Sequence, residues 1–271
     1  MIITAMKRAA VVYVILLLIG STVTNAQQTK DIRRVVADEV EEGDGATVRR
    51  LIPMRGVKNY DPYVLFDDFS ITPPSGFPDH FHSGFEVVTY VVQGQLQHKD
   101  SQGNQVVLGA GDVQCFSTGS GVVHSEMPQG TEQVRGFQIW INLPKEFKNM
   151  IPGYQYVNAL KIPVRKVTDE VTIKTIVAQG ATVRLKAEVL IEEIQIKSGG
   201  KYKVFLPKGY NGFLYVSSGI ATIEGSVQLK GSAVFFTTQD LEIKADQETV
   251  LLLVSGLPLG EPIHRKGSIV K

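Results

Sequence analysis

The sequence predicts an all-β fold in two similar units of antiparallel strands. Short runs rich in β-branched and aromatic residues recur along the chain and are bounded by Gly, Pro, Asn or Asp, as in a sandwich or barrel. An internal repeat is the second observation. Residues 94–117 and residues 219–237 each run from a turn glycine through a strand and a polar turn into another strand. Two copies of one small β unit account for both observations.

The expected strands follow one another at regular spacing. In order, they are VRRLIP (48–53), VVTYVV (87–92), QLQHKD (95–100), QVVLGAGDVQCF (105–116), VRGFQIWINL (134–143), EVLIEEIQI (188–196), KYKVFLP (201–207), GFLYVSSG (212–219), VQLKGSAVFF (227–236) and TVLLLVS (249–255). Prolines interrupt residues 143–163, which favours an irregular linker or short helices. The acidic run 38–45 is expected to be a solvated turn. We therefore expect a first unit over 27–142 and a second over 164–271.

The composition is that of an ordinary globular protein. Of the 271 residues, 43% are hydrophobic and 20% are charged, and the formal net charge is +1. No long run of Lys or Arg provides the basic surface that nucleic acids require, so no nucleic acid partner is expected. Cys115 is the single cysteine, which excludes an internal disulfide. Its apolar strand favours a place in the core over a role as nucleophile.

The N-terminus has the order of a secretory signal. Two basic residues precede the apolar run 9–20, and small residues around Ala26 offer a cleavage site before Gln27. The apolar run is shorter than the roughly 20 residues that a membrane-spanning helix needs. We expect residues 1–26 to be a signal peptide and the mature protein to be exported, periplasmic or secreted, without a stable membrane anchor. An uncleaved anchor helix is the alternative.

Four candidate metal ligands occur as two pairs with strand spacing. His80 and His82 lie two residues apart, so on a strand they point to one face. His124 and Glu126 repeat this spacing. If the pairs lie on neighbouring strands, three imidazoles and one carboxylate converge, a set that suits Fe, Mn, Ni, Cu or Zn. The alternative is that each histidine satisfies only a local hydrogen bond.

The other histidines are weaker candidates. His98 precedes a polar turn and is expected to be a solvated strand-end residue, with a place at the entrance of the site as the alternative. His264 is expected to lie in a solvated tail. Residues 125–263 contain no histidine. A histidine-based site must therefore belong to the first unit.

Several motifs resemble the pirin family of two-domain cupins. They are YDPYVLFDDF (60–69), GFPDHFHSGFEVVTYVVQG (76–94), HKDSQGN (98–104), GDVQ (111–114), GVVHSEMP (121–128), WINLP (140–144) and LPLGEPI (257–263). The resemblance extends from about Arg33 to Ile263 and is stronger in the first half. It implies a bicupin, two antiparallel jelly-roll β-barrels joined by a linker, with one iron site in the first barrel.

The resemblance also assigns the ligands. Carried onto this chain, the family's iron ligands are His80, His82, His124 and Glu126. The broader cupin pattern His-x-His-x3-Glu would instead make Glu86 the carboxylate ligand. The pirin resemblance favours Glu126 and leaves Glu86 beside the ligands.

Two functions are consistent with the resemblance. The first is a quercetinase-like, metal-dependent dioxygenase that uses O2 and a flavonol or related polyphenol. The metal would lower the pKa of the substrate's 3-hydroxyl, and Glu126 or Glu86 would accept the proton. The second is a non-catalytic metal-binding or redox-sensing protein, since one fold supports both outcomes. An open, apolar pocket beside the ligands would favour the first.

Overall fold

The computed structural model describes residues 32–54, 56–178, 180, 183–237 and 240–271. Within these ranges almost all regular structure is β, and the helical segments are single 3-10 turns, η1 (Lys145–Phe147) and η2 (Ala159–Lys161). The expected all-β class is confirmed. The expected signal peptide, residues 1–26, lies outside the described residues. No helix in the described part of the chain is long and apolar enough to cross a membrane.

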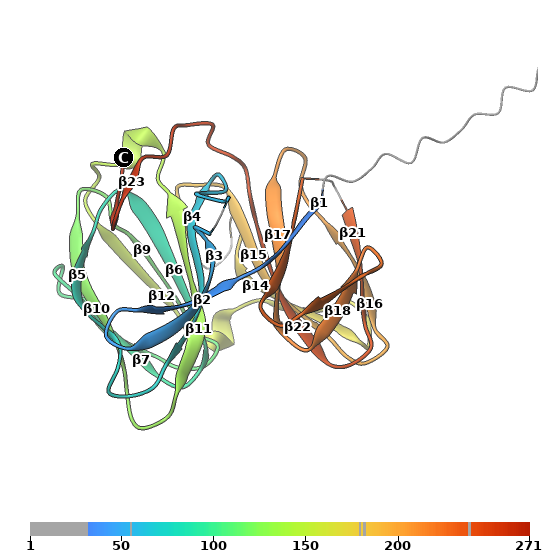
Figure 1. Cartoon of the computed structure of the whole chain (residues 1–271). Coiled ribbons are helices and arrows are strands. Elements are labelled where there is room, and N and C mark those ends of the chain that lie inside the picture. The colour runs from blue at the N-terminus through green and yellow to red at the C-terminus, as the bar shows by residue number, and fades with distance from the viewer. Residues whose placement is uncertain (1–31, 55, 179, 181–182, 238–239) are drawn as a thin grey trace, which may run out of the picture.

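The first unit consists of a seven-stranded and a four-stranded antiparallel sheet (Figure 1). The larger sheet has the order β12 (Gly153–Val157), β9 (Val113–Ser117), β6 (Phe85–Gln93), β11 (Val134–Asn142), β4 (Tyr63–Ile71), β3 (Ala46–Ile52) and β2 (Asp38–Glu42). The smaller sheet has the order β5 (Phe77–His82), β10 (Val122–Pro128), β7 (Leu96–Asp100) and β8 (Gln105–Leu108). Apolar side chains of both sheets pack between them, as in a jelly roll.

The second unit repeats this arrangement strand for strand. Its larger sheet has the order β1 (Ile32–Val36), β20 (Ser232–Phe236), β17 (Asn211–Ser218), β22 (Thr249–Gly256), β15 (Val189–Ile196), β14 (Val171–Val177) and β13 (Val164–Lys166). Its smaller sheet has the order β16 (Lys201–Phe205), β21 (Asp240–Ala245), β18 (Ile220–Ile223) and β19 (Ser226–Leu229). The repeat seen in the sequence corresponds to β7–β9 and β18–β20. In each unit the two sheets stay separate and do not close into a barrel.

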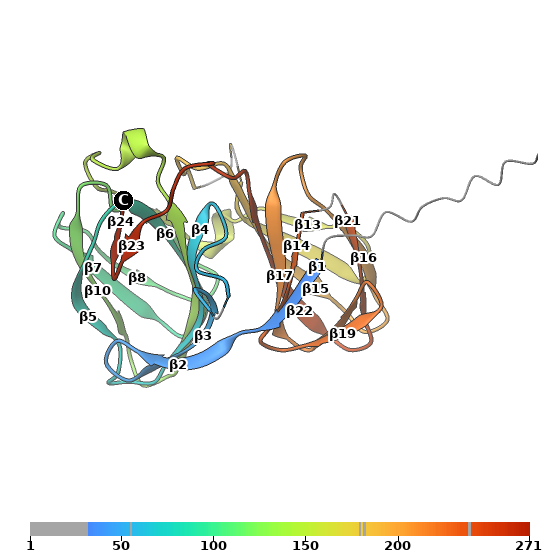
Figure 2. The same ribbon diagram turned by 45° about the horizontal axis from the view of Figure 1, so that its top comes forward.

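The first described strand lies in the second unit, and the C-terminal hairpin lies in the first (Figure 2). Strand β1 pairs with β20 of the second unit, whereas the C-terminal hairpin of β23 (Arg265–Lys266) and β24 (Ile269–Val270) returns to the first. The expected linker, 143–163, contributes β12 to the first unit's larger sheet. Strand pairing therefore crosses the expected division into units over 27–142 and 164–271. Strand β1 belongs to the first range but pairs in the second unit, and the C-terminal hairpin belongs to the second range but contacts the first unit. Residues 38–42 of the acidic run, which was expected to be a turn, form the exposed edge strand β2, since their backbone pairs with β3. The expected solvated turn is confined to residues 43–45.

The two larger sheets pack against each other through their outer faces. The ring centroid of Phe66 lies 5.2 Å from that of Phe213 and 5.0 Å from that of Tyr215. Two buried hydrogen bonds cross the same layer: the Tyr90 hydroxyl donates to Glu193, and the Tyr215 hydroxyl donates to Asp68. Because both faces of these sheets are covered, their central strands are buried at nearly every position.

The interiors of the two units differ in chemistry. In the second unit, β16 and β21 occupy the places of β5 and β10, and their inward residues Val204, Leu241 and Ile243 are buried in an apolar cluster. In the first unit the equivalent strands carry the histidines. The described interior of the second unit is thus a packed core, which agrees with the absence of histidine over residues 125–263.

Candidate metal centre

Pairing of β5 with β10 brings the predicted histidines together. His124 lies directly opposite His80, and Val122 lies opposite His82, so all three imidazoles project into the interior of the first unit. The Nε2 atoms of His80 and His82 are 2.9 Å apart, and the ring centroid of His124 lies 4.3 Å from that of His80 and 4.8 Å from that of His82. One ligand nitrogen from each residue lies within 4.8 Å of the others.

The protonation states of these histidines suit metal coordination. Burial lowers the pKa of His82 to about 3 and holds the pKa of His124 well below its ordinary value, with neighbouring histidines adding to the effect. Both rings are therefore neutral near pH 7, the form that binds metals. Within the described residues, both ring nitrogens of His124 and Nδ1 of His82 have no hydrogen-bond partner. Buried nitrogens of this kind are costly unless an ion binds them, so the cluster fits a divalent metal ion.

Glu126 lies on the other side of His124, held by three donors. Its Oε1 accepts hydrogen bonds from Thr89 Oγ1 and Gln114 Nε2, and its Oε2 accepts one from Gln138 Nε2. Burial raises the pKa of Glu126 to about 7 despite these donors. A carboxylate oxygen of Glu126 lies within 4.8 Å of a His124 nitrogen. The structure thus brings Glu126 close to His124 and His98, whereas His80 and His82 group with His124 without Glu126, so the four predicted ligands do not form one group.

Two further side chains orient the amides that hold Glu126. The indole Nε1 of Trp140 donates to Gln138 Oε1 at 3.0 Å, and the Tyr154 hydroxyl donates to Gln114 Oε1 at 3.0 Å. Because each amide oxygen is occupied in this way, each amide nitrogen faces the carboxylate. Side chains of β9, β11 and β12 thus hold the candidate ligand Glu126 in place. No residue spacing in the sequence indicates this hydrogen-bond network.

Glu86 does not join the cluster. Its side chain projects from the face of β6 that packs on the second unit, where it accepts hydrogen bonds from Ser117 Oγ at 2.7 Å and from the backbone N–H of Lys186 at 2.8 Å. Its neighbour on the chain, Phe85, points the other way and packs beside His82. The expectation that Glu86 lies beside the ligands is therefore wrong, because consecutive residues of a strand alternate between faces.

His98 lies in a different environment from the one that the sequence predicts. It was expected to be solvated but is fully buried, with 0% of its surface exposed. Its ring lies 5.4 Å from that of His124 and stacks on Tyr154, and its Nε2 is 3.3 Å from Asp100. His98, His124 and Glu126 form a second group with ligand atoms within 4.8 Å of one another.

A cavity of about 530 Å³ opens beside His80 and His82. Its apolar wall comes from the inner face of the larger sheet and from β5, with the lining residues Val48, Leu65, Phe69, Phe77 and Trp140. Its volume falls in the range of about 300–1,000 Å³ that is usual for small-molecule sites. The polar lining includes Gln138, and a charged group formed by Glu42, Arg50, Asp67, Asp79 and Arg265. The cavity therefore combines an apolar, partly aromatic wall with five charged side chains in one lining.

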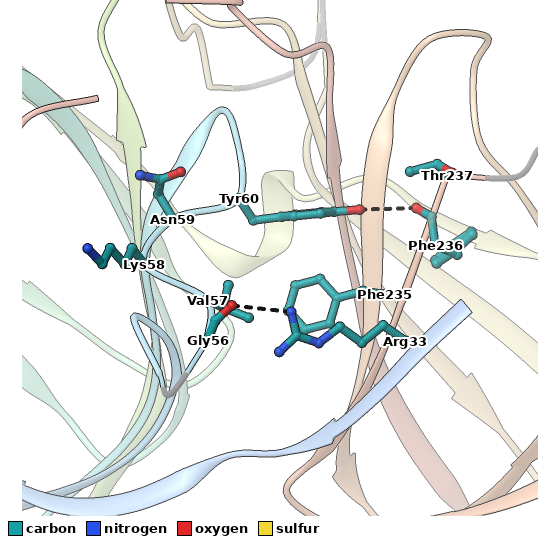
Figure 3. Close-up of a pocket in the computed structure, with 9 residues that line it drawn as sticks. All are labelled: Arg33, Gly56, Val57, Lys58, Asn59, Tyr60, Phe235, Phe236 and Thr237. Carbon is teal, nitrogen blue, oxygen red and sulfur yellow. Dashed lines mark hydrogen bonds between the residues drawn. The ribbon is translucent and has the colours of Figure 1, made fainter. Parts of the chain in front are cut away.

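A second, smaller cavity lies between the two units (Figure 3). It is lined by the side chains of Arg33, Tyr60 and Phe235 among others, and the Tyr60 hydroxyl donates to the backbone oxygen of Phe236. None of the histidines lines it.

Cys115 is buried in the core, as expected. Burial raises the pKa of its thiol well above the ordinary value, which disfavours a role as nucleophile.

Two family models match the chain: Pirin over residues 45–141 and the Pirin C-terminal cupin domain over residues 191–271. The chain belongs to the pirin family. A pirin-like protein of Solanum lycopersicum is 35% identical to this pirin-family chain over 251 residues, which cover 88% of this chain and 85% of that protein. The pirin of Mus musculus is 34% identical over 262 residues, covering 90% and 88%. A crystal structure of quercetin 2,3-dioxygenase from Acinetobacter baumannii aligns with a TM-score of 0.80 at 25% identity, covering 88% of this chain and 90% of that one.

Proposed function

We propose that this pirin-family protein is a metal-dependent dioxygenase that acts on a flavonol or a related polyphenol. The observation that carries the proposal is that His80 and His82 of the three-histidine cluster line a cavity of small-molecule size with an aromatic wall. The similarity to quercetin 2,3-dioxygenase from Acinetobacter baumannii supports the same reaction class.

We propose His80, His82, His124 and Glu126 as the ligands of one divalent ion, with iron the first choice and Mn, Ni, Cu or Zn the alternatives. Geometry supports this set, because the imidazole nitrogens converge and Glu126 is the carboxylate that approaches His124. A bound ion would supply a Lewis acid that lowers the pKa of a substrate hydroxyl. His98, which shares a group with His124 and Glu126, would lie behind the ligands.

The chain's own residues bind and orient the substrate. Phe69, Phe77 and Trp140 give the cavity an aromatic wall that suits a planar polyphenol and excludes water from the reacting face. Gln138 lines the cavity and also donates to Glu126 Oε2, so this oxygen lies one side chain behind the cavity surface. We propose Glu126, and not Glu86, as the acceptor of the substrate's proton. Glu126 lies beside His124, whereas Glu86 lies on the other face of β6 and belongs to neither histidine group.

The test is oxygen uptake by the protein loaded in turn with iron, manganese, nickel, copper and zinc. Quercetin should be consumed, and an analogue without the 3-hydroxyl should not, since a site that activates this hydroxyl must discriminate between the two compounds. Uptake at the free-metal background with every metal would refute the dioxygenase. The protein would then be a non-catalytic metal-binding or redox-sensing pirin.

A further inference from the structure

The C-terminal hairpin forms part of the cavity beside the candidate metal ligands. The backbone N–H of Ser83 donates to the oxygen of Ser268 at 3.2 Å, and that of Val270 donates to the oxygen of Ser83 at 2.9 Å. At Gly84 a Cβ atom would lie 1.9 Å from the Val270 oxygen, so only glycine permits this close approach. The hairpin is thus fixed next to His82, and it places Arg265 in the cavity lining.

The guanidinium of Arg265 is held in one orientation. Its Cζ lies 4.8 Å from the ring centroid of Trp140, and Trp140 lies 4.7 Å from the ring of His82. Its Nη1 donates to the oxygen of Val64 at 3.0 Å, and its Nε donates to the oxygen of Gly267 at 2.9 Å. A guanidinium carries five N–H groups, so these bonds leave others for a ligand. Trp140 separates this cation from the histidines by about one aromatic ring.

The two arginines of the cavity differ in their partners. Arg50 binds Asp67 through two hydrogen bonds of 2.9 and 2.7 Å and also pairs with Glu42 at 2.8 Å. Among the described residues, no carboxylate lies at ion-pair distance from Arg265, whose bonds go to backbone oxygens. Glu42 and Asp67 are engaged by Arg50, and Asp79 is exposed at the rim. Arg265 is therefore the arginine of this lining with no carboxylate at ion-pair distance, and Asp67 and Glu42 act on its charge only at longer range.

We infer that Arg265 binds an acidic oxygen, a phenolate or carboxylate, of an aromatic ligand whose other end points toward the histidine cluster. A planar guanidinium suits such an oxygen because it offers parallel N–H donors, and its contact with Trp140 and the backbone limits the entropy lost on binding. The inference rests on the proposed function only in taking this cavity as the substrate site. It narrows the substrate class to aromatic compounds with an acidic group remote from the metal.

Trp140 gives a direct reporter, because it is the single tryptophan of the chain. The metal-free protein, dialysed against a chelator, is titrated with naphthalene-2-carboxylate and with the neutral naphthalene-2-carboxamide at constant ionic strength, and tryptophan quenching is followed. The wild type should bind the carboxylate about tenfold more tightly than the amide, as expected for a charge-assisted hydrogen bond. Arg265→Gln should abolish this preference, and Arg265→Lys should retain part of it.

Lys266→Gln is the matched control, since it removes the same charge from the same strand but lies outside the cavity lining. It should keep the preference. Equal binding of both probes by the wild type, a preference that survives Arg265→Gln, or an equal loss in Lys266→Gln would overturn the inference. If Arg265→Gln does not fold, Arg265→Met, which keeps the apolar stem over Trp140, replaces it. The titration uses neither metal nor O2, so its outcome is independent of the dioxygenase test.

Discussion

Gln138→Leu should weaken metal binding and destabilise the metal-free protein by removing one donor from Glu126. Gln138 Nε2 is the one side chain of the described residues that donates to Oε2, whereas Oε1 accepts from both Thr89 and Gln114. A leucine side chain keeps the carboxylate covered but leaves both Glu126 Oε2 and the indole Nε1 of Trp140 without their hydrogen-bond partners. Each unsatisfied buried group costs about 1–3 kcal/mol, so we expect the free energy of unfolding to fall by at least about 2 kcal/mol. Metal affinity should fall about 10- to 100-fold, as is typical when a residue that orients a ligand is lost.

Thr89→Val is the control for this prediction. It also removes one hydrogen bond from Glu126, but Gln114 still donates to the same oxygen. We expect a loss of about 1 kcal/mol or less in unfolding free energy and less than tenfold in metal affinity. Denaturant unfolding of the metal-free proteins and competition with a chromophoric chelator give the two quantities. If Thr89→Val costs as much as Gln138→Leu in both measurements, the asymmetry of the two oxygens does not matter and the reasoning fails.

Three further predictions follow from the site, the fold and the N-terminus. His124→Ala should lose most of the bound metal, whereas Glu86→Gln should keep full occupancy because Glu86 lies on the face of β6 that points away from the histidines. Element analysis that shows the reverse order of metal content would contradict the assignment. Tyr215→Phe should lower the free energy of unfolding by about 1–3 kcal/mol, since the buried carboxylate of Asp68 loses a donor at 2.8 Å; an unchanged denaturation midpoint would count against this. We also propose export with cleavage before Gln27, which mass spectrometry of the mature protein tests; an intact precursor would argue against a cleaved signal.

The shared face of each candidate pair was predictable because it follows from local spacing, whereas the approach of His124 to His80 and His82 depends on the pairing of β5 with β10. His80 and His82 share a face of any strand, and His124 and Glu126 repeat the pattern. The position of Glu86 was not predictable in the same way. Both faces of β6 are covered, so apolar residues occur at odd and at even positions along this strand. The alternation of residue types therefore does not indicate which face Glu86 occupies.

Long-range pairing explains the other differences. The return of the C-terminal hairpin to the first unit depends on contacts such as that between Ser83 and Ile269, which no local pattern specifies. The sequence predicts a solvated tail at His264. His264 is exposed as expected, but its neighbour Arg265 lies in the cavity lining. His98 left a weak signal, since it has the parity of Leu96, which is buried in the core, but the polar turn that follows it suggested exposure.

The origin of the oxygen atoms in the product tests the central claim most directly. The iron-loaded mature protein is incubated with quercetin under ¹⁸O2, and the product is analysed by mass spectrometry beside that of His124→Ala prepared in the same way. A dioxygenase reaction at the three-histidine cluster predicts two labelled atoms in the wild-type product and no product above the free-metal background from the variant. Label that comes from water, or equal labelled product from His124→Ala, would contradict the account.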